Sequence, residues 1–207
     1  MSIAESHPTD SAAIFLQKIS PTEKLYLASD DIDPPFAIAA IIEGVGAVSI
    51  EDVRAAVGLA SAACPGSRLV RQGNQWIDSE AAPLVTEVDG RIDWTDSSDD
   101  SVINRPFVSA GATTEVIVMT DRADATTLIF RAFHGVIDGS GLRLWVSQVF
   151  RALRGEELEP ALDPISDMDI VRKLGKSGAP TRLLPTRPSP FGRPSSGGEP
   201  VKSEPAS

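Results

Sequence analysis

Runs of apolar residues with the length of β-strands predict a sheet. Residues 35–44, PFAIAAIIEG, form a nearly continuous apolar run closed by a glycine, which predicts a buried strand. Residues 114–120 (TEVIVMT) and 126–133 (TTLIFRAF) predict two more strands, joined by the polar loop 121–125. Two shorter runs within 67–78, separated by Gly-Asn, predict a hairpin, and 83–90 predicts a further short strand.

Two segments have helical periodicity instead. The first follows Ser49, whose spacing to Asp52 resembles a capping box, and the Cys-Pro-Gly at 64–66 ends it. The second is capped by Asp138 or Ser140 and ends at Gly155. The apolar stripes are Val53, Ala56, Val57 and Ala60 in the first helix, and Leu142, Trp145, Val146, Val149, Phe150 and Leu153 in the second. Helices with such stripes must pack on a sheet, so the sequence predicts an α/β (α+β) sandwich with helices packed on a mixed sheet.

Composition and charge narrow the class of protein. The 207 residues are 42% hydrophobic, enough to bury a core, and the formal net charge is −10, which argues against nucleic acid as a partner. Cys64 is the one cysteine, so an internal disulfide is excluded. The first residues lack the features of a signal peptide, and no apolar run is long enough to span a membrane. We therefore expect a cytoplasmic protein.

The composition changes near residue 176. Residues 176–207 contain 7 Pro, 6 Ser and 4 Gly, which is typical of an extended linker or crossover tail. We expect a flexible N-terminus at 1–12, one folded region at 13–175 and this tail at 176–207.

The candidate chemistry lies where the strand 126–133 gives way to the last helix. His134, one of two histidines in the chain, stands there beside Gly135, with Asp138 and Gly139 following. An imidazole at the carboxyl end of a strand can act as a general base, and a glycine beside it leaves room for a substrate. The simpler alternative is a polar histidine in a turn, bonded to the backbone.

The segment FHGVIDGSG (133–141) resembles the His-x-x-x-Asp-Gly signature of the chloramphenicol-acetyltransferase-like acyltransferases. That superfamily includes condensation domains of peptide synthetases, BAHD acyltransferases and polyketide-associated acyltransferases. The match consists of His134, Asp138 and Gly139, while Phe133 stands where many members have a first histidine. The order of elements over residues 20–160 also resembles the family's N-terminal lobe, which we place at 13–175.

The resemblance implies a reaction. His134 would be the general base that deprotonates a hydroxyl or amine acceptor, which then attacks an acyl thioester. The thioester, of coenzyme A or of the phosphopantetheine on an acyl carrier protein, would be a co-substrate, with no cofactor bound tightly and no metal. Asp138 would hold the loop by pairing with an arginine, and Gly135 and Gly139 would be structural in the same loop.

The resemblance covers only half of such an enzyme. Members have two similar halves with the active site between them, and the Asp-Phe-Gly-Trp-Gly-like motif of the second half is absent from this chain. We expect a second polypeptide resembling the C-terminal lobe as a partner, with a small-molecule acceptor and possible docking of an acyl carrier protein. The alternative is a non-catalytic binding or interaction module that retains the half-fold.

Overall fold

The computed structural model describes residues 16–33, 35–121, 125–161 and 167–175, so the predicted N-terminus (1–12) and tail (176–207) lie outside the described residues. The chain divides into two units, 1–170 and 171–207. The described elements are β1 (Leu16–Lys18), α1 (Pro21–Ile32), β2 (Ala37–Val45), α2 (Ile50–Ala63), a 3-10 turn (Pro65–Arg68), β3 (Leu69–Gln72), β4 (Gln75–Asp78), β5 (Leu84–Asp89), β6 (Thr114–Thr120), β7 (Ala125–Phe133), α3 (Gly139–Leu153) and α4 (Asp167–Lys173).

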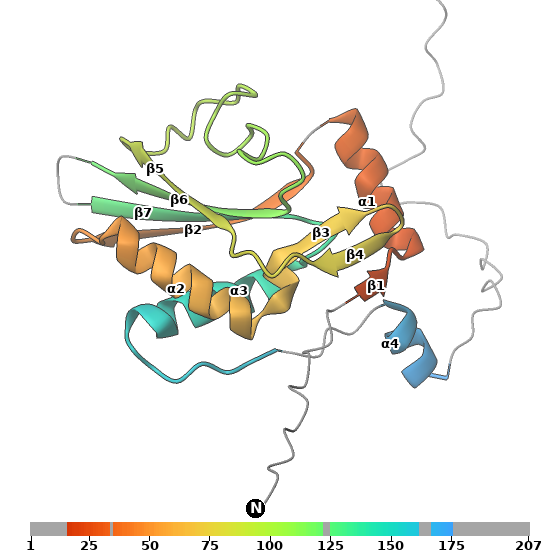
Figure 1. The fold of residues 1–207 in the computed structure, drawn as a ribbon. Coiled ribbons are helices and arrows are strands. Elements are labelled where there is room, and N and C mark those ends of the chain that lie inside the picture. The colour runs from red at the N-terminus through yellow and green to blue at the C-terminus, as the bar shows by residue number, and fades with distance from the viewer. Residues whose placement is uncertain (1–15, 34, 122–124, 162–166, 176–207) are drawn as a thin grey trace, which may run out of the picture. The chain divides into compact units, whose positions relative to one another are not determined.

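The larger sheet has the strand order β2-β7-β6-β5 (Figure 1). β2 and β6 each pair antiparallel with β7, whereas β5 joins β6 in parallel, so the sheet is mixed. Successive residues of a strand point to opposite faces, and in β7 Phe130 belongs to one buried cluster and Ile129 to another. The predicted fold class, a mixed sheet with helices packed on it, is confirmed.

A second, three-stranded sheet has the order β1-β4-β3. β3 and β4 form the hairpin predicted from the Gly-Asn pair, with Gly73 in the left-handed conformation at φ +59°. Glycine adopts that conformation without the steric cost of a Cβ, which suits a two-residue hairpin turn. The short strand β1 completes this sheet and was not predicted.

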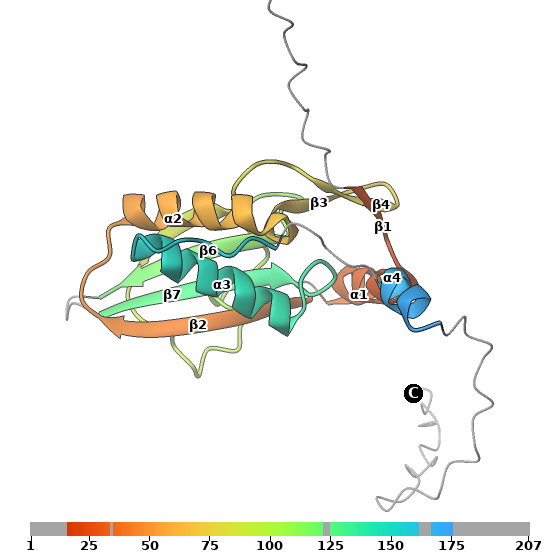
Figure 2. The ribbon, with the colours of Figure 1, turned by 90° about the horizontal axis from the view of Figure 1, so that it is seen from below.

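Helices α2 and α3 cover one face of the larger sheet, as Figure 2 shows from below. Their predicted stripes are confirmed, since Val53, Val57 and Val149 are fully buried. The Trp145 ring meets the edge of the Phe130 ring at 5.6 Å between centroids. Its indole nitrogen donates a hydrogen bond of 3.1 Å to the Ser61 hydroxyl, so the tryptophan joins the two helices to each other and to the sheet.

The first predicted strand, at 35–44, is present as β2, but it is not buried. It lies at the edge of the sheet, with only β7 as a neighbour, and its residues are half-buried or exposed. Val45, its last residue, is 97% exposed. The prediction of burial was wrong because the apolar run matches a strand covered on all sides, and the described chain leaves one edge of this strand without a neighbour.

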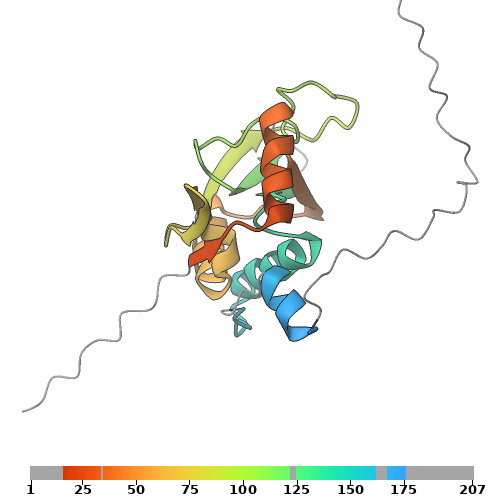
Figure 3. The ribbon, with the colours of Figure 1, turned by 90° about the vertical axis from the view of Figure 1, so that its right-hand side faces the viewer.

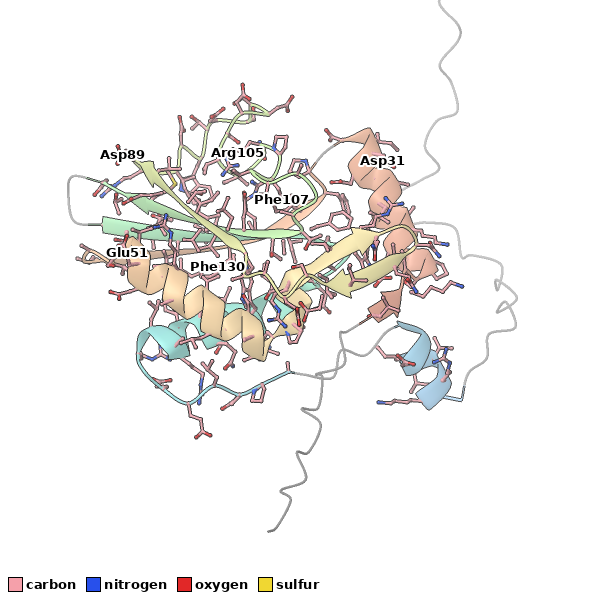
Figure 4. All side chains as sticks on the ribbon, in the orientation of Figure 1. Asp31, Glu51, Asp89, Arg105, Phe107 and Phe130 are labelled. Carbon is pink, nitrogen blue, oxygen red and sulfur yellow. The ribbon has the colours of Figure 1, made fainter. Side chains whose placement is uncertain are left out.

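The opposite face of the sheet holds a buried ion pair. Arg131 and Glu115 are 0% and 1% exposed, and their side chains meet at 2.5 Å. The Arg131 guanidinium also donates to the Arg105 carbonyl and lies 5.0 Å from the centre of the Phe107 ring, and the Val108 amide donates to Glu115. Figure 4 labels Arg105 and Phe107, which lie between β5 and β6. Burial lowers the pKa of Arg131, and Glu115 opposes that shift. The pair thus attaches the segment before β6 to the sheet.

We predict that Glu115→Ala lowers the free energy of unfolding by about 3–5 kcal/mol, because it leaves Arg131 buried without its carboxylate. The measurement is urea denaturation followed by circular dichroism. Glu156→Ala removes the carboxylate of an exposed pair with Arg154 and is the matched control, with a midpoint close to that of the parent. Equal midpoints for the two variants would contradict the importance of the buried pair.

Candidate functional site

His134 directly follows the last residue of β7, at the strand end predicted from the sequence. Its backbone N–H donates to the Phe36 carbonyl at 3.0 Å, which continues the pairing of β2 with β7 by one residue beyond the ladder. A turn then leads into α3, with the Val136 amide donating to the Phe133 carbonyl at 3.1 Å. The backbone of His134 is therefore held by the sheet, not by a free loop.

The imidazole of His134 lies against two aromatic rings. Its centroid is 4.9 Å from that of Tyr26 and 5.9 Å from that of Phe36, with interplanar angles of 20° and 15°. Tyr26 and Phe36 also contact each other, at 5.3 Å. Nδ1 of His134 is enclosed and has no hydrogen-bond partner among the described residues. Ring contacts, rather than a side-chain hydrogen bond, therefore surround the imidazole.

Tyr26 belongs to α1, a helix that the sequence analysis missed. The Ser20 hydroxyl accepts from the Glu23 amide at 3.3 Å and the Glu23 carboxylate accepts from the Ser20 amide at 2.5 Å, a complete capping box with Pro21 at the first helical position. The sequence SPTE therefore carried the signal for this helix. Its apolar periodicity is weak because it contains no fully buried residue, as its position at the front of Figure 3 illustrates.

A cavity of about 500 Å³ adjoins His134. Residues from α1, from the turn before β3, from β4 and from α3 contribute to its lining, including Tyr26, Cys64, Trp76, Leu144 and Trp145. The charged side chains along the described lining are the carboxylates of Glu23 and Asp138. The cavity is therefore mainly aromatic and aliphatic, with its fixed charge negative.

Asp138 caps α3, as one of the two predicted alternatives had it. Its carboxylate accepts from the Gly141 amide at 2.7 Å, which satisfies a free N–H at the helix N-terminus and suits the helix dipole. The pairing with an arginine that the resemblance implied is not found among the described residues. Arg68, for example, pairs with Asp78 instead.

The two glycines of the motif differ in their surroundings. A Cβ on Gly135 would lie 2.3 Å from Cε1 of Phe133, whereas a Cβ on Gly139 would meet no atom within 4 Å. Gly135 lines the cavity beside His134, and the position of its missing Cβ is next to the Phe133 ring, so the room that it leaves for a substrate stays a prediction. Phe133 is 4% exposed and packs against Trp76, so the residue in place of the first histidine is part of the core.

Two other kinds of chemistry find little support at this site. Cys64 is 6% exposed and burial raises the pKa of its thiol, which fits a small buried hydrophobe better than a nucleophile. Within the described ranges, no three His, Cys, Asp or Glu side chains lie close enough together to hold a metal ion.

The helices within the described ranges include none long and apolar enough to cross a membrane.

Comparison with solved structures shows the same fold in acyl-transferring enzymes. The condensation domain of the monacolin K polyketide synthase MokA superposes with a TM-score of 0.56 at 13% identity, covering 78% of this chain and 40% of that one. F. graminearum TRI101, complexed with ethyl coenzyme A, gives 0.52 at 12% identity, covering 70% and 40%. Polyketide synthase associated protein 5 from Mycobacterium tuberculosis gives 0.53 at 14% identity, covering 77% and 39%. No family model and no curated protein matches the chain.

These matches define the class of fold. The described residues adopt part of the fold of condensation domains and chloramphenicol-acetyltransferase-like acyltransferases, as the sequence motif predicted. The chain spans about 40% of the length of these three structures, which is consistent with a half-fold. The low identities make this a likeness of fold, and the chemistry of this chain is a separate question.

We predict that Gly135→Ala lowers the free energy of unfolding by about 1–3 kcal/mol, because the added methyl group must displace the buried Phe133 ring. Gly139→Ala is the matched control, since the same methyl group meets open space there, and it should melt like the parent. Thermal denaturation of both variants tests this. If Gly135→Ala melts like Gly139→Ala, the ring is free to move away and the steric account fails.

For Asp138 we predict that replacement by alanine costs about 1 kcal/mol of stability through the lost cap, whereas asparagine, which caps a helix about as well, costs little. Chemical denaturation of both variants makes the comparison. An Asn variant as unstable as the Ala variant would show that the negative charge of Asp138 matters more than its hydrogen bond.

Proposed function

We propose that this chain is the N-terminal half of an acyltransferase that moves an acyl group from a thioester to a hydroxyl or an amine, with His134 as the general base. The observation that carries the proposal is the position of His134, at a strand end and beside a cavity of about 500 Å³. The fold shared with condensation domains and acyltransferases supports the same reaction class.

The surroundings of the imidazole suit a general base. Nδ1 is enclosed without a hydrogen-bond partner among the described residues, and His134 lines the cavity, so we assign Nε2 to the acceptor. Nε2 takes the proton of the acceptor's hydroxyl or amine as its oxygen or nitrogen attacks the thioester carbonyl. The tetrahedral intermediate then collapses, the carbon–sulfur bond breaks, and the thiol leaves with a proton returned from the imidazole.

The thioester is an acyl group on coenzyme A or on a phosphopantetheine arm. A neighbour in fold, TRI101, was solved with ethyl coenzyme A, which supports the first source. The carboxylates of Glu23 and Asp138 disfavour phosphate groups inside the cavity near His134. The nucleotide or the arm's phosphate would therefore bind elsewhere, on local basic residues or on a second polypeptide.

A second polypeptide resembling the C-terminal lobe is part of the proposal. The chain spans about 40% of the enzymes it resembles in fold. It leaves β2 as a half-buried edge strand, and it exposes Leu25 and Ile32 of α1 at 64% and 84%. Apolar surface of this kind is typical of an interface. The second lobe would supply the rest of the substrate tunnel.

We predict that the chain releases thiol from acyl thioesters in the presence of a C-terminal-lobe polypeptide, and that His134→Ala lowers this rate by roughly a hundredfold to ten-thousandfold. Thiol release from a panel of acyl-coenzyme A donors, with alcohol and amine acceptors, is the measurement. His7→Ala, which changes the chain's other histidine, is the control and should retain the parent rate.

Two outcomes would contradict the proposal in different ways. A folded His134→Ala protein with the parent rate would remove His134 as the base. Binding of acceptors or of the second polypeptide without any thiol release would favour the alternative, a non-catalytic binding module that retains the half-fold. A monomer of residues 1–207 that turns over fully by itself would show that no second lobe is needed.

A further inference from the structure

We infer that Tyr26 is a positioning residue, which holds the His134 imidazole so that Nε2 faces the cavity. The catalytic consequence rests on the proposed function, but the orientation of the ring does not. Tyr26 contacts the imidazole at 4.9 Å between centroids and also lines the cavity, whereas Phe36 contacts it at 5.9 Å from the β2 side.

Among the described residues, His134 lacks the hydrogen-bonding partner that usually orients a catalytic histidine. A catalytic histidine is commonly oriented by a third group that binds its second ring nitrogen. Here Nδ1 is enclosed and the described residues offer it no carboxylate, hydroxyl or carbonyl. The backbone of His134 is fixed through Phe36, but rotation about the side-chain bonds is not limited by any hydrogen bond of the ring. Steric and stacking contacts are left to define the orientation.

The helix that carries Tyr26 is attached to the strand end that carries His134. It lies four residues before Asp30 on α1, so the two side chains share one face of the helix. The Asp30 carboxylate accepts from the Phe36 amide at 2.7 Å, which ties that face of α1 to the start of β2. The Phe36 carbonyl in turn accepts from His134. Phe36 thus links the helix that carries Tyr26 to the strand end that carries the histidine.

The near-parallel planes make the contact specific to a flat ring. The interplanar angle of 20° between Tyr26 and His134 is one that another aromatic residue can reproduce and an aliphatic one cannot. Tyr26→Phe should therefore preserve the orientation of the imidazole, while Tyr26→Leu should lose it. Lys24→Leu is the matched control, because it places the same side chain at an exposed position of α1.

The first test measures the orientation directly in the full 207-residue chain by NMR. Only two histidines are present, so His7→Ala assigns the imidazole signals. We expect nuclear Overhauser contacts between the rings of His134 and Phe36 in the parent, in Tyr26→Phe and in Lys24→Leu, and their loss in Tyr26→Leu. Unchanged contacts in a folded Tyr26→Leu protein would overturn the inference.

The second test uses thiol release with the C-terminal-lobe polypeptide. Tyr26→Leu should lower kcat by roughly tenfold to a hundredfold with KM unchanged, as expected for a misplaced base, and Tyr26→Phe should restore the parent value. A Tyr26→Phe protein as slow as Tyr26→Leu would overturn the stacking role and assign the effect to the hydroxyl. If the parent itself releases no thiol, the proposed function fails, and the NMR contacts alone decide whether Tyr26 positions the ring.

Discussion

The antiparallel ladder between β2 and β7 is the constraint on which both the core and the site depend. It runs without a break from the pair Ala37–Phe133 to the pair Val45–Ala125. Side chains alternate between the two faces, so a slip of one residue would bring Arg131 into the apolar layer under α2 and α3. The register that avoids this also sets His134 opposite Phe36, one step beyond the ladder. The strand register that buries the apolar side chains of the sheet therefore also determines the position of His134.

The two faces of the larger sheet are stabilised by different forces. Under the helices the contacts are apolar, with Phe130 against Trp145. On the other face, Arg131 of the buried pair donates to the Arg105 carbonyl, and Glu115 accepts from the Val108 amide. Such a buried pair adds little net stability, but breaking it is costly. Conformations of residues 105–108 that would break the pair are therefore strongly disfavoured. Apolar packing under α2 and α3 supplies most of the burial, and the ion pair on the opposite face favours one conformation of residues 105–108.

Much of this fold could be predicted from apolar periodicity. The apolar run of β2, the buried strands β6 and β7 and the apolar stripes of α2 and α3 are patterns that a sequence displays openly. α1 escaped because no residue on it is fully buried, and only its capping box marked it. At the site, the strand-end position of His134 could be predicted, but its contact with Tyr26 could not, because the pairing of a helix face with a distant strand end leaves no local signal. The same limit explains Gly135, because the linear motif does not show that the Phe133 ring lies next to the position of its missing Cβ.

The apolar surfaces that the described residues leave uncovered belong to β2 and α1, and the same two elements border the candidate site. β2 has an apolar sequence suited to full cover but stands at an edge, and its start supplies Phe36. α1 has exposed Leu25 and Ile32, and it supplies Tyr26. Any polypeptide that covered β2 and α1 would therefore cover residues next to the two rings that surround the imidazole. Closing the site in this way would exclude water and lower the local dielectric, which strengthens each electrostatic contact made to a developing charge. Under the proposed function, assembly and catalysis would then be coupled by geometry, because the apolar surface proposed to bind the second lobe adjoins the residues around His134.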